Sequence, residues 1–152
     1  MAKRTKPYSS FSVDDLEKAK KFYGDLLGLT VKEFSREGCG SMLSLMLDDQ
    51  TEVLIYPKKD HVPASFTVLN IPVEDVEAMV KKLSGKGISF EHYDGADEQG
   101  VMHAEGPVIA WCKDPAGNFI SIVEADEIED YAAETESAVE NKSYKYAEEF
   151  VF

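Results

Sequence analysis

Apolar and polar residues alternate over short stretches of this chain and then switch to helical spacing, and the switch happens twice. In the first half, residues 8–13 alternate in the manner of a strand, and Leu16 to Leu27 place apolar side chains on one helix face. Glycine and polar turns then separate three alternating stretches, 29–35, 41–47 and 52–57. The first half therefore predicts a strand, a helix and three further strands.

The second half repeats this order. A strand is expected over 65–71, a helix over 73–84, and strands over 88–93, 108–113 and 118–124. Between the last two strands, the letters Asp-Pro-Ala-Gly-Asn place proline and glycine where a tight turn requires them. The second half therefore also predicts the order β-α-β-β-β.

The two predicted helices open on the same short motif. Val13 to Glu17 reads Val-Asp-Asp-Leu-Glu, and Val73 to Glu77 reads Val-Glu-Asp-Val-Glu sixty positions later. A period near sixty is longer than the roughly 20–50 residues of solenoid repeats, which favours two copies that close on each other. The chain is therefore interpreted as a duplicated module.

The duplication predicts the fold and the domain boundaries. We expect an α+β fold in which two βαβββ modules pair into a cup-shaped, eight-stranded mixed sheet. Module one covers 8–57, a linker covers 58–63, and module two covers 64–124, so that 8–124 forms a single domain. Residues 125–152 are expected to form an acidic C-terminal tail with an amphipathic helix.

Charge and hydropathy exclude two classes of partner. The 152 residues hold 29 Asp and Glu against 16 Lys and Arg, so the formal net charge is −13. A protein that binds phosphate backbones is expected to carry a basic patch, so no nucleic-acid partner is expected. No apolar run approaches the ~20 residues that span a bilayer, so no membrane partner is expected. A soluble, cytoplasmic protein is predicted.

Cysteine and histidine give no catalytic motif. Cys39 and Cys112 lie in different modules without the spacing of a zinc or disulfide framework, so unpaired thiols are expected. Neither cysteine is tied by a motif to a histidine base, and we assign no catalytic residue. Two pairs around a long loop, His92-x-Asp94 and His103-x-Glu105, could form a metal site, but solvated loop residues are the favoured interpretation.

Several of these motifs resemble one known family. The helix opening at Val13 to Glu17, the letters Phe-Tyr at Phe22 and Leu-Gly-Leu at Leu27, and the turn at Asp114 to Asn118 are similar to the vicinal oxygen chelate superfamily. The resemblance covers about residues 8 to 124. It implies a glyoxalase-like fold and a homodimer. Members include glyoxalase I, extradiol dioxygenases, epimerases and fosfomycin-resistance enzymes, which use a divalent metal, and bleomycin-binding proteins, which use none.

The positions that hold the metal in those enzymes carry unsuitable residues here. The resemblance places the ligands at Tyr8, at Val68, at Ser121, and at Ile55 or Leu54. Divalent ions are held by imidazole nitrogens, thiolates or carboxylate oxygens, and these side chains offer none. We therefore expect no metal ligands and no cofactor.

The alternation of the strands predicts which side chains line the floor of the cup. A small organic molecule with an apolar or planar part would suit this lining, although the same side chains could fill the cup as packed core, and both interpretations stay open. The predicted ligand-binding residues are Tyr8, Ser10, Ile55, Phe66, Val68, Asn70, Trp111, Phe119 and Ser121.

The residues are compatible with three functions. The favoured one is a metal-independent small-molecule-binding protein that resembles bleomycin-resistance proteins, an interpretation that favours a binder over an enzyme and leaves catalysis open. The first alternative is a divalent-metal-dependent glyoxalase- or dioxygenase-like enzyme, which would be a lyase or dioxygenase. The second alternative is an interaction module that uses the acidic tail and binds no ligand. The expected partners are a small organic ligand and a second copy of the chain.

Overall fold

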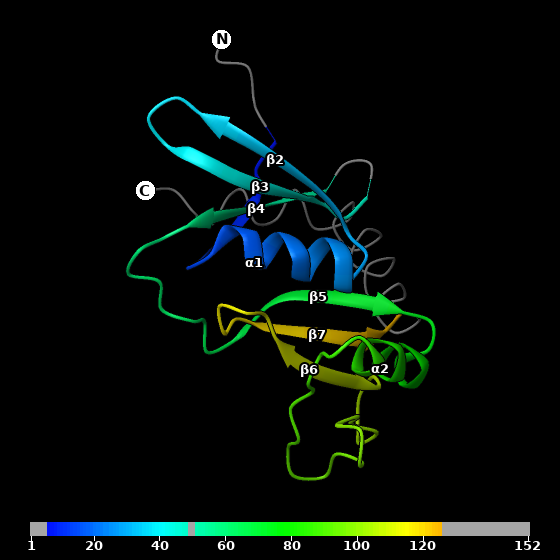
Figure 1. The fold of residues 1–152 in the computed structure, drawn as a ribbon. Helices are drawn as coiled ribbons and strands as arrows, with labels where there is room; N and C mark the ends of the chain where they lie inside the picture. Colours follow the sequence, from blue (N-terminus) through cyan, green and yellow to red (C-terminus); the bar gives the residue numbers. More distant parts are fainter. Residues whose placement is uncertain (1–5, 49–50, 126–152) are drawn as a thin grey trace, which may run out of the picture.

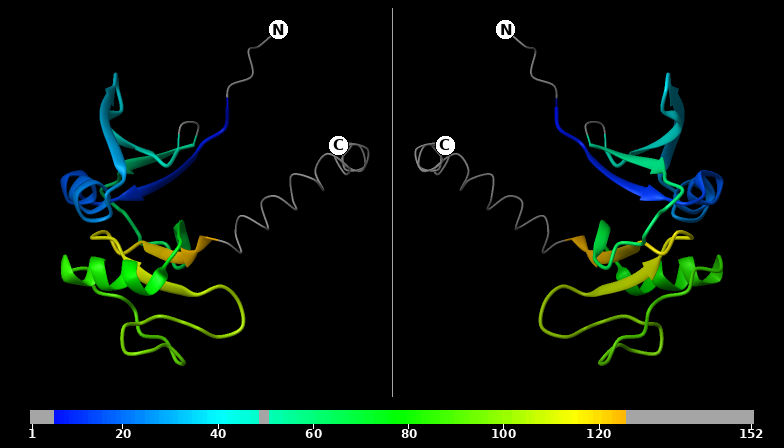
Figure 2. Two further views of the ribbon diagram at one scale, coloured as in Figure 1. Left: turned by 90° about the vertical axis from the view of Figure 1, so that its right-hand side faces the viewer. Right: turned by 90° about the vertical axis from the view of Figure 1, so that its left-hand side faces the viewer.

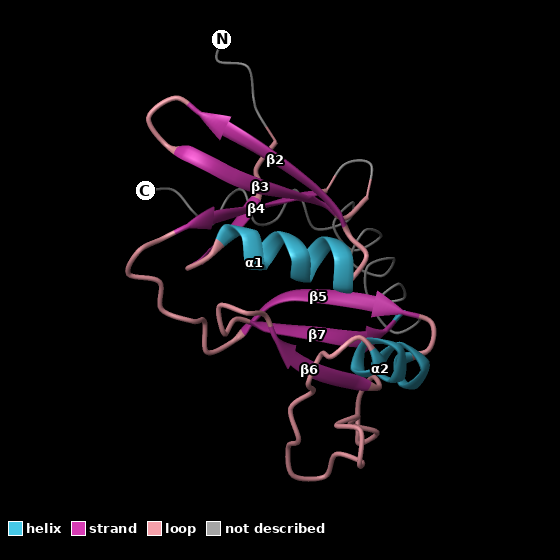
Figure 3. Ribbon diagram, in the orientation of Figure 1, coloured by secondary structure: helices cyan, strands magenta, loops and turns pink. Residues whose placement is uncertain are grey.

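A computed structural model describes residues 6–48 and 51–125, and it shows an α+β fold (Figures 1 and 3). The expected acidic tail lies almost wholly outside the described residues. Within the described residues, two helical segments and seven strands follow the predicted order closely. The bounds are β1 Ser9–Val13, α1 Leu16–Lys20 with its π-helical continuation η1 Lys21–Leu26, β2 Thr30–Arg36, β3 Gly40–Met46, β4 Glu52–Pro57, β5 Thr67–Val73, α2 Val76–Gly85, β6 Ile109–Lys113 and β7 Phe119–Glu124.

The strands form two mixed sheets with matching topology. The first has the order β1-β4-β3-β2 and the second the order β5-β7-β6. In each sheet the strand before the helix pairs in parallel with the last strand of its module, β1 with β4 and β5 with β7, and the other pairs are antiparallel. The sequence duplication is therefore also a duplication of strand pairing.

The expected eighth strand and the continuous eight-stranded sheet are corrected by the structure. Residues 88–93 contribute only a bridge from Phe90 to Cys112 and one hydrogen bond from Glu91 N to Trp111 O at 2.8 Å. Ile88 and Phe90 are buried, so the alternation is real. The chain then turns into a loop that packs closely on Glu91, since a Cβ on Gly100 would lie 2.6 Å from Glu91 O. That loop ends the pairing after one bridge.

The repeated helix motif has the same local role in both modules. Asp15 caps α1 by accepting a hydrogen bond from Lys18 N at 3.0 Å, and Asp75 caps α2 by accepting one from Ala78 N at 2.8 Å. An aspartate at this position satisfies a backbone N–H that the helix itself leaves unpaired. None of the helices described is long and apolar enough to cross a membrane.

One hydrophobic core runs through both modules. The helices lie on the same side of the two sheets, as Figure 2 shows, and pack on the sheet face that carries Phe11 and Val13 in module one and Ile120 and Ile122 in module two. Phe11 contacts the Tyr23 ring of η1 at a centroid distance of 5.8 Å. The buried side chains of both modules therefore lie mainly between the helices and the sheets.

Candidate ligand-binding cleft

A buried carboxylate at the turn between β6 and β7 ties the two modules together. Asp114 accepts hydrogen bonds from Ala116 N and Asn118 N on Oδ1, at 2.9 and 2.8 Å. Its Oδ2 accepts from Asn118 Nδ2 at 3.1 Å and from Tyr23 Oη of module one at 2.7 Å. Burial and the adjacent carboxylate raise the pKa of the Tyr23 phenol, so it remains a donor.

Asn118 and His61 extend this contact to β1. Asn118 Nδ2 donates to Ser12 O at 2.9 Å, and Asn118 Oδ1 accepts from Ala64 N at 3.2 Å. His61 Nε2 lies 3.0 Å from the Ala116 carbonyl, which can only accept, so Nε2 carries the proton. The other ring nitrogen, Nδ1, forms a hydrogen bond with Ser12 Oγ at 2.8 Å. The linker histidine thus holds β1 against the turn of module two.

An open cleft of about 390 Å³ lies beside these contacts, between the edge strands β1 and β5. Its volume falls within the ~300–1,000 Å³ of small-molecule sites. We call it the inter-module cleft. It is lined by Ser9, Ser10, Phe11, Ser12, Tyr56, Val62, Ala64, Phe66, Thr67, Val68 and Asn118.

The wall of the inter-module cleft combines exposed apolar surface with hydroxyl groups. Val62 is 79% exposed and Phe66 is 68% exposed, although both are large apolar side chains. Ser10, Ser12 and Thr67 add hydroxyl groups to the lining. Because the side chains that line it are all uncharged, the cleft suits a ligand with an apolar or aromatic body and a few hydrogen-bonding atoms.

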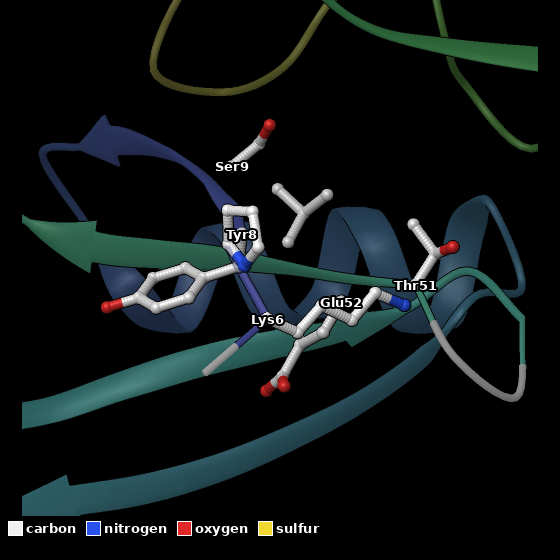
Figure 4. A pocket seen from close by; sticks show the side chains of 7 residues that line it. Lys6, Tyr8, Ser9, Thr51 and Glu52 are labelled. Carbon is white, nitrogen blue, oxygen red and sulfur yellow. The ribbon is translucent and has the colours of Figure 1, made fainter. Parts of the chain in front are cut away.

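A second, smaller groove of about 230 Å³ lies at the start of β1. It is lined by Lys6, Pro7, Tyr8, Ser9, Thr51, Glu52 and Val53. Figure 4 shows Tyr8 pointing its hydroxyl away from Thr51, and the ring is 59% exposed. Tyr8 therefore does not line the inter-module cleft, although its neighbour Ser9 lines both recesses.

The structure brings only part of the predicted floor together. Ser10, Phe66 and Val68 line the inter-module cleft. Ile55, by contrast, is fully buried in the core, which corrects its expected place on the floor. Ile55 pairs in register with Phe11, and Phe11 faces the helix, so the strand alternation carries Ile55 to the core side.

The other predicted residues lie on one face of the second sheet. Ser121 Oγ donates to Asn70 Oδ1 at 2.6 Å, and Ser121 pairs in register with Trp111. Trp111 Nε1 donates to Thr67 Oγ1 of the cleft at 3.1 Å. Phe119 pairs with Thr67 and packs under Lys113 Nζ, at 5.0 Å from the ring centroid. Trp111 and Phe119 therefore contact Thr67 of the cleft without lining it.

Sequence reasoning missed several lining residues. Tyr56 pairs with Ser12 and could have been found by following the register from β1 to β4. Val62 and Ala64 fell in or next to the stretch treated only as a linker. Thr67 and Val68 both line the cleft because the pairing of β5 shifts between Thr67 and Leu69, which breaks the alternation.

The positions expected to hold a metal in related enzymes do not form a donor set. Val68 and Leu54 have no donor atom. Ser121 Oγ is already bonded to Asn70, and Tyr8 lies in the second groove. A divalent cation needs several converging nitrogen, sulfur or carboxylate ligands, and these residues do not fit one.

The cysteines have contrasting environments. Both are free thiols, with Cys39 exposed and Cys112 buried in β6. Burial, reinforced by Asp114 and Glu91, raises the pKa of the Cys112 thiol to about 12. A thiol that stays protonated is a poor nucleophile, so Cys112 is a packing residue.

Comparison with known proteins gives a family and several related folds. The family model described as Glyoxalase/Bleomycin resistance protein/Dioxygenase superfamily matches residues 7–122. No curated protein matches the sequence.

Solved structures with a similar fold come from several bacteria. TnmS3, an antibiotic binding protein from Streptomyces sp. CB03234, is 23% identical with a TM-score of 0.61, over 83% of this chain and 99% of its own. A glyoxalase family protein from Enterococcus faecalis is 22% identical with a TM-score of 0.59, over 82% and 100%. A superfamily member from Sphaerobacter thermophilus DSM 20745 is 22% identical with a TM-score of 0.58, over 79% and 98%. At these identities the likeness establishes the fold.

Proposed function

Because this chain belongs to the Glyoxalase/Bleomycin resistance protein/Dioxygenase superfamily, we propose that it binds a small organic molecule in the inter-module cleft without the help of a metal. The observation that carries the proposal is the lining of the cleft. Exposed Phe66 and Val62 face the same recess as the hydroxyls of Ser10, Ser12 and Thr67. Large exposed apolar side chains around a recess are typical of a binding surface.

The edges of the two sheets supply a second kind of contact. β1 and β5 are both edge strands, so their outer backbone groups are not used within their sheets. Asn118 Nδ2, for example, donates a hydrogen bond to the backbone carbonyl of Ser12 in β1. Other backbone N–H and C=O groups along the cleft can orient polar atoms of a ligand, while the apolar wall provides burial.

The absence of a fitting donor set at the four family positions supports a binder over a metal-dependent enzyme. The similarity to TnmS3, an antibiotic binding protein, is consistent with that choice. The net charge of −13 favours neutral or cationic ligands over anionic ones. We therefore expect aromatic or cationic natural-product-like compounds as the ligand class. The homodimer expected from the resemblance stays a prediction.

Thermal shift with a panel of planar aromatic compounds, including metal-free bleomycin, tests the proposal. A compound present at about 100 times its Kd should stabilise the protein by about 2.7 kcal/mol, and addition of a chelator should leave the shift unchanged. Failure of every aromatic or cationic compound to change the melting temperature would contradict the proposal. A shift abolished by chelation would favour the metal-dependent alternative.

Two variants test whether the ligand binds in the inter-module cleft. Phe66→Ala should weaken affinity about 5- to 30-fold, because a central aromatic contact is commonly worth about 1 to 2 kcal/mol. Its stability should stay within about 0.5 kcal/mol of wild type, because the ring is already exposed. Ser10→Trp should fill the cleft and abolish binding. Ser35→Trp, on the exposed face of β2, is the matched control and should bind normally.

A further inference from the structure

The loop between α2 and β6 brings three metal-ligating side chains together on a face that the inter-module cleft does not use. Glu77 comes from the first turn of α2, and Asp97 and His103 come from the loop. His103 Nε2 lies 3.1 Å from Asp97 Oδ2 and 3.5 Å from Glu77 Oε1, and all three ligand atoms lie within 4.8 Å of one another. We propose that these residues bind a divalent transition-metal ion, with Zn²⁺ as the representative.

The distances between the ligand atoms suit such an ion. Zinc binds imidazole nitrogen and carboxylate oxygen at about 2.0–2.2 Å, which places two tetrahedral ligands about 3.3 Å apart. The two separations from His103 Nε2, 3.1 and 3.5 Å, lie on either side of that value. A cation between the three atoms therefore requires only small side-chain movements.

The loop holds two of the three ligands in place before any ion arrives. Asp97 Oδ1 accepts from Gln99 N at 2.8 Å and from Val101 N at 2.9 Å, which leaves Oδ2 directed at His103. Met102, next to His103, pairs with Ile109 through hydrogen bonds of 2.8 and 3.2 Å. Prior ordering of this kind lowers the entropic cost of binding.

Helix α2 fixes the third ligand. Glu77 is two residues after the cap Asp75, whose carboxylate accepts from Ala78 N at 2.8 Å. Glu77 is still 65% exposed, so its carboxylate can swing toward the ion without losing a buried contact.

Local charge also favours a cation. Two carboxylates converge on one imidazole, and Glu74, Asp75 and Glu124 line an adjacent recess of about 240 Å³ that Glu77 shares. A divalent ion would neutralise the two ligand carboxylates. Three protein ligands leave coordination positions for water, and the recess has room for it. The imidazole nitrogen selects zinc, nickel, cobalt or copper over magnesium or calcium, which prefer oxygen ligands alone.

This site is independent of the proposed ligand-binding function. It would link α2 to the loop that carries Tyr93, whose ring contacts Trp111 at a centroid distance of 5.5 Å. Metal binding should therefore hold the already ordered loop more firmly against α2, and amide exchange over residues 97–103 should become slower. The sequence offered His92-x-Asp94 and His103-x-Glu105 as possible pairs, whereas the carboxylates near His103 Nε2 in the structure are those of Asp97 and Glu77.

Equilibrium dialysis of the full chain against Zn²⁺, followed by elemental analysis, tests the proposal. Wild type should hold about one Zn²⁺ that depends on these residues. His103→Asn and Glu77→Gln should each weaken that binding by at least about 10-fold, since loss of even an outer-shell partner costs about 10–100-fold. His92→Asn is the matched control, because His92 lies on the same loop and bonds to Glu98 O instead. It should bind as wild type does.

A second measurement tests directly whether His103 coordinates the ion. The chain has three histidines, so imidazole resonances can be assigned, and Zn²⁺ should shift those of His103 without shifting those of His61 or His92. Wild-type-like binding in both His103→Asn and Glu77→Gln would overturn the proposal and would place the ion elsewhere in the chain. So would a wild-type chain that binds no stoichiometric Zn²⁺, or an excess of Mg²⁺ that displaces the ion.

Discussion

Asp114 does more for the architecture than its position in a turn suggests. Its carboxylate accepts four hydrogen bonds, and one of them comes from the other module. A buried carboxylate is tolerated only where hydrogen bonds satisfy its oxygens. Here all the donors belong to the turn itself or to the buried Tyr23. The sequence showed a proline–glycine turn at this point, but the link to Tyr23 required knowledge of the fold.

Tyr23→Phe tests the link between the modules at a single atom. The change removes the Oη donor to Asp114 while keeping the ring packed against Phe11 and Phe22. Loss of a hydrogen bond to a charged group should lower the free energy of unfolding by about 1.5–3 kcal/mol, measured by urea denaturation. Tyr8→Phe, at an exposed tyrosine, should change it by less than about 0.5 kcal/mol. Equal effects of the two changes would mean that the Tyr23 bond does not stabilise the fold.

The thiols should differ sharply in reactivity. Burial raises the pKa of Cys112 to about 12, so its thiol stays protonated at about pH 8 and is also shielded from a reagent, whereas Cys39 is exposed. Titration with a disulfide reagent should detect one fast thiol in the native protein and two after unfolding. Cys39→Ser should abolish the fast reaction. Fast reaction of both thiols in the folded wild type would contradict the burial of Cys112.

At the scale of the elements, local pattern predicted most strands and both helices, because strand alternation and helical spacing depend on neighbouring residues. The stretch 88–93 was predicted as a strand for the same reason, and its alternation does place Ile88 and Phe90 inside. What ended its pairing was the loop packed on Glu91, a contact made by residues later in the chain. Such non-local contacts cannot be read from periodicity.

The candidate site shows the same limit. Ser10, Phe66 and Val68 could be predicted because they follow from the strand positions of the two modules. Ile55 was misplaced because the choice between Ile55 and Leu54 depends on the β1–β4 register, which pairs Ile55 with core-facing Phe11. Val62 lines the cleft only because the linker folds back beside β1 and β5, and a linker sequence carries no periodicity that predicts this.

The turn between β6 and β7 packs against Pro63 of the linker, and a substitution at Gly117 tests how tightly. Gly117 has φ +85, and a Cβ there would lie 2.9 Å from Pro63 Cγ of the linker. Gly117→Ala should therefore combine a left-handed strain of about 1–2 kcal/mol with an overpacking cost of about 1–3 kcal/mol. Gly38→Ala, with φ +80 and no atom within 4 Å, carries only the strain. Thermal or urea unfolding should show the larger loss for Gly117→Ala, and equal losses would mean that Pro63 moves aside freely.

At the scale of the whole molecule, two kinds of contact join the modules. The hydrophobic core is continuous from Phe11 to Ile122, and polar bonds from Asn118 and His61 cross to Ser12. Residues of β1 and β5, which belong to different sheets, line the inter-module cleft beside these contacts. Binding at this cleft would therefore depend on the relative position of the modules as well as on its lining residues.

We expect residues 8–124 to unfold as one cooperative unit, because separating the modules would expose part of a shared core. The protein has one tryptophan, Trp111 in module two, so its fluorescence reports on that module, whereas far-UV circular dichroism reports on both. The two signals should give the same midpoint and slope in urea.

Asn118→Ala removes the hydrogen bonds to Ser12 O and Ala64 N and should lower the midpoint by an amount that corresponds to about 1–3 kcal/mol. Its two signals should still coincide, because the apolar core remains intact. Separate midpoints in the wild type would show that the modules fold independently, and separate midpoints only in Asn118→Ala would show that the polar contacts, rather than the core, couple them.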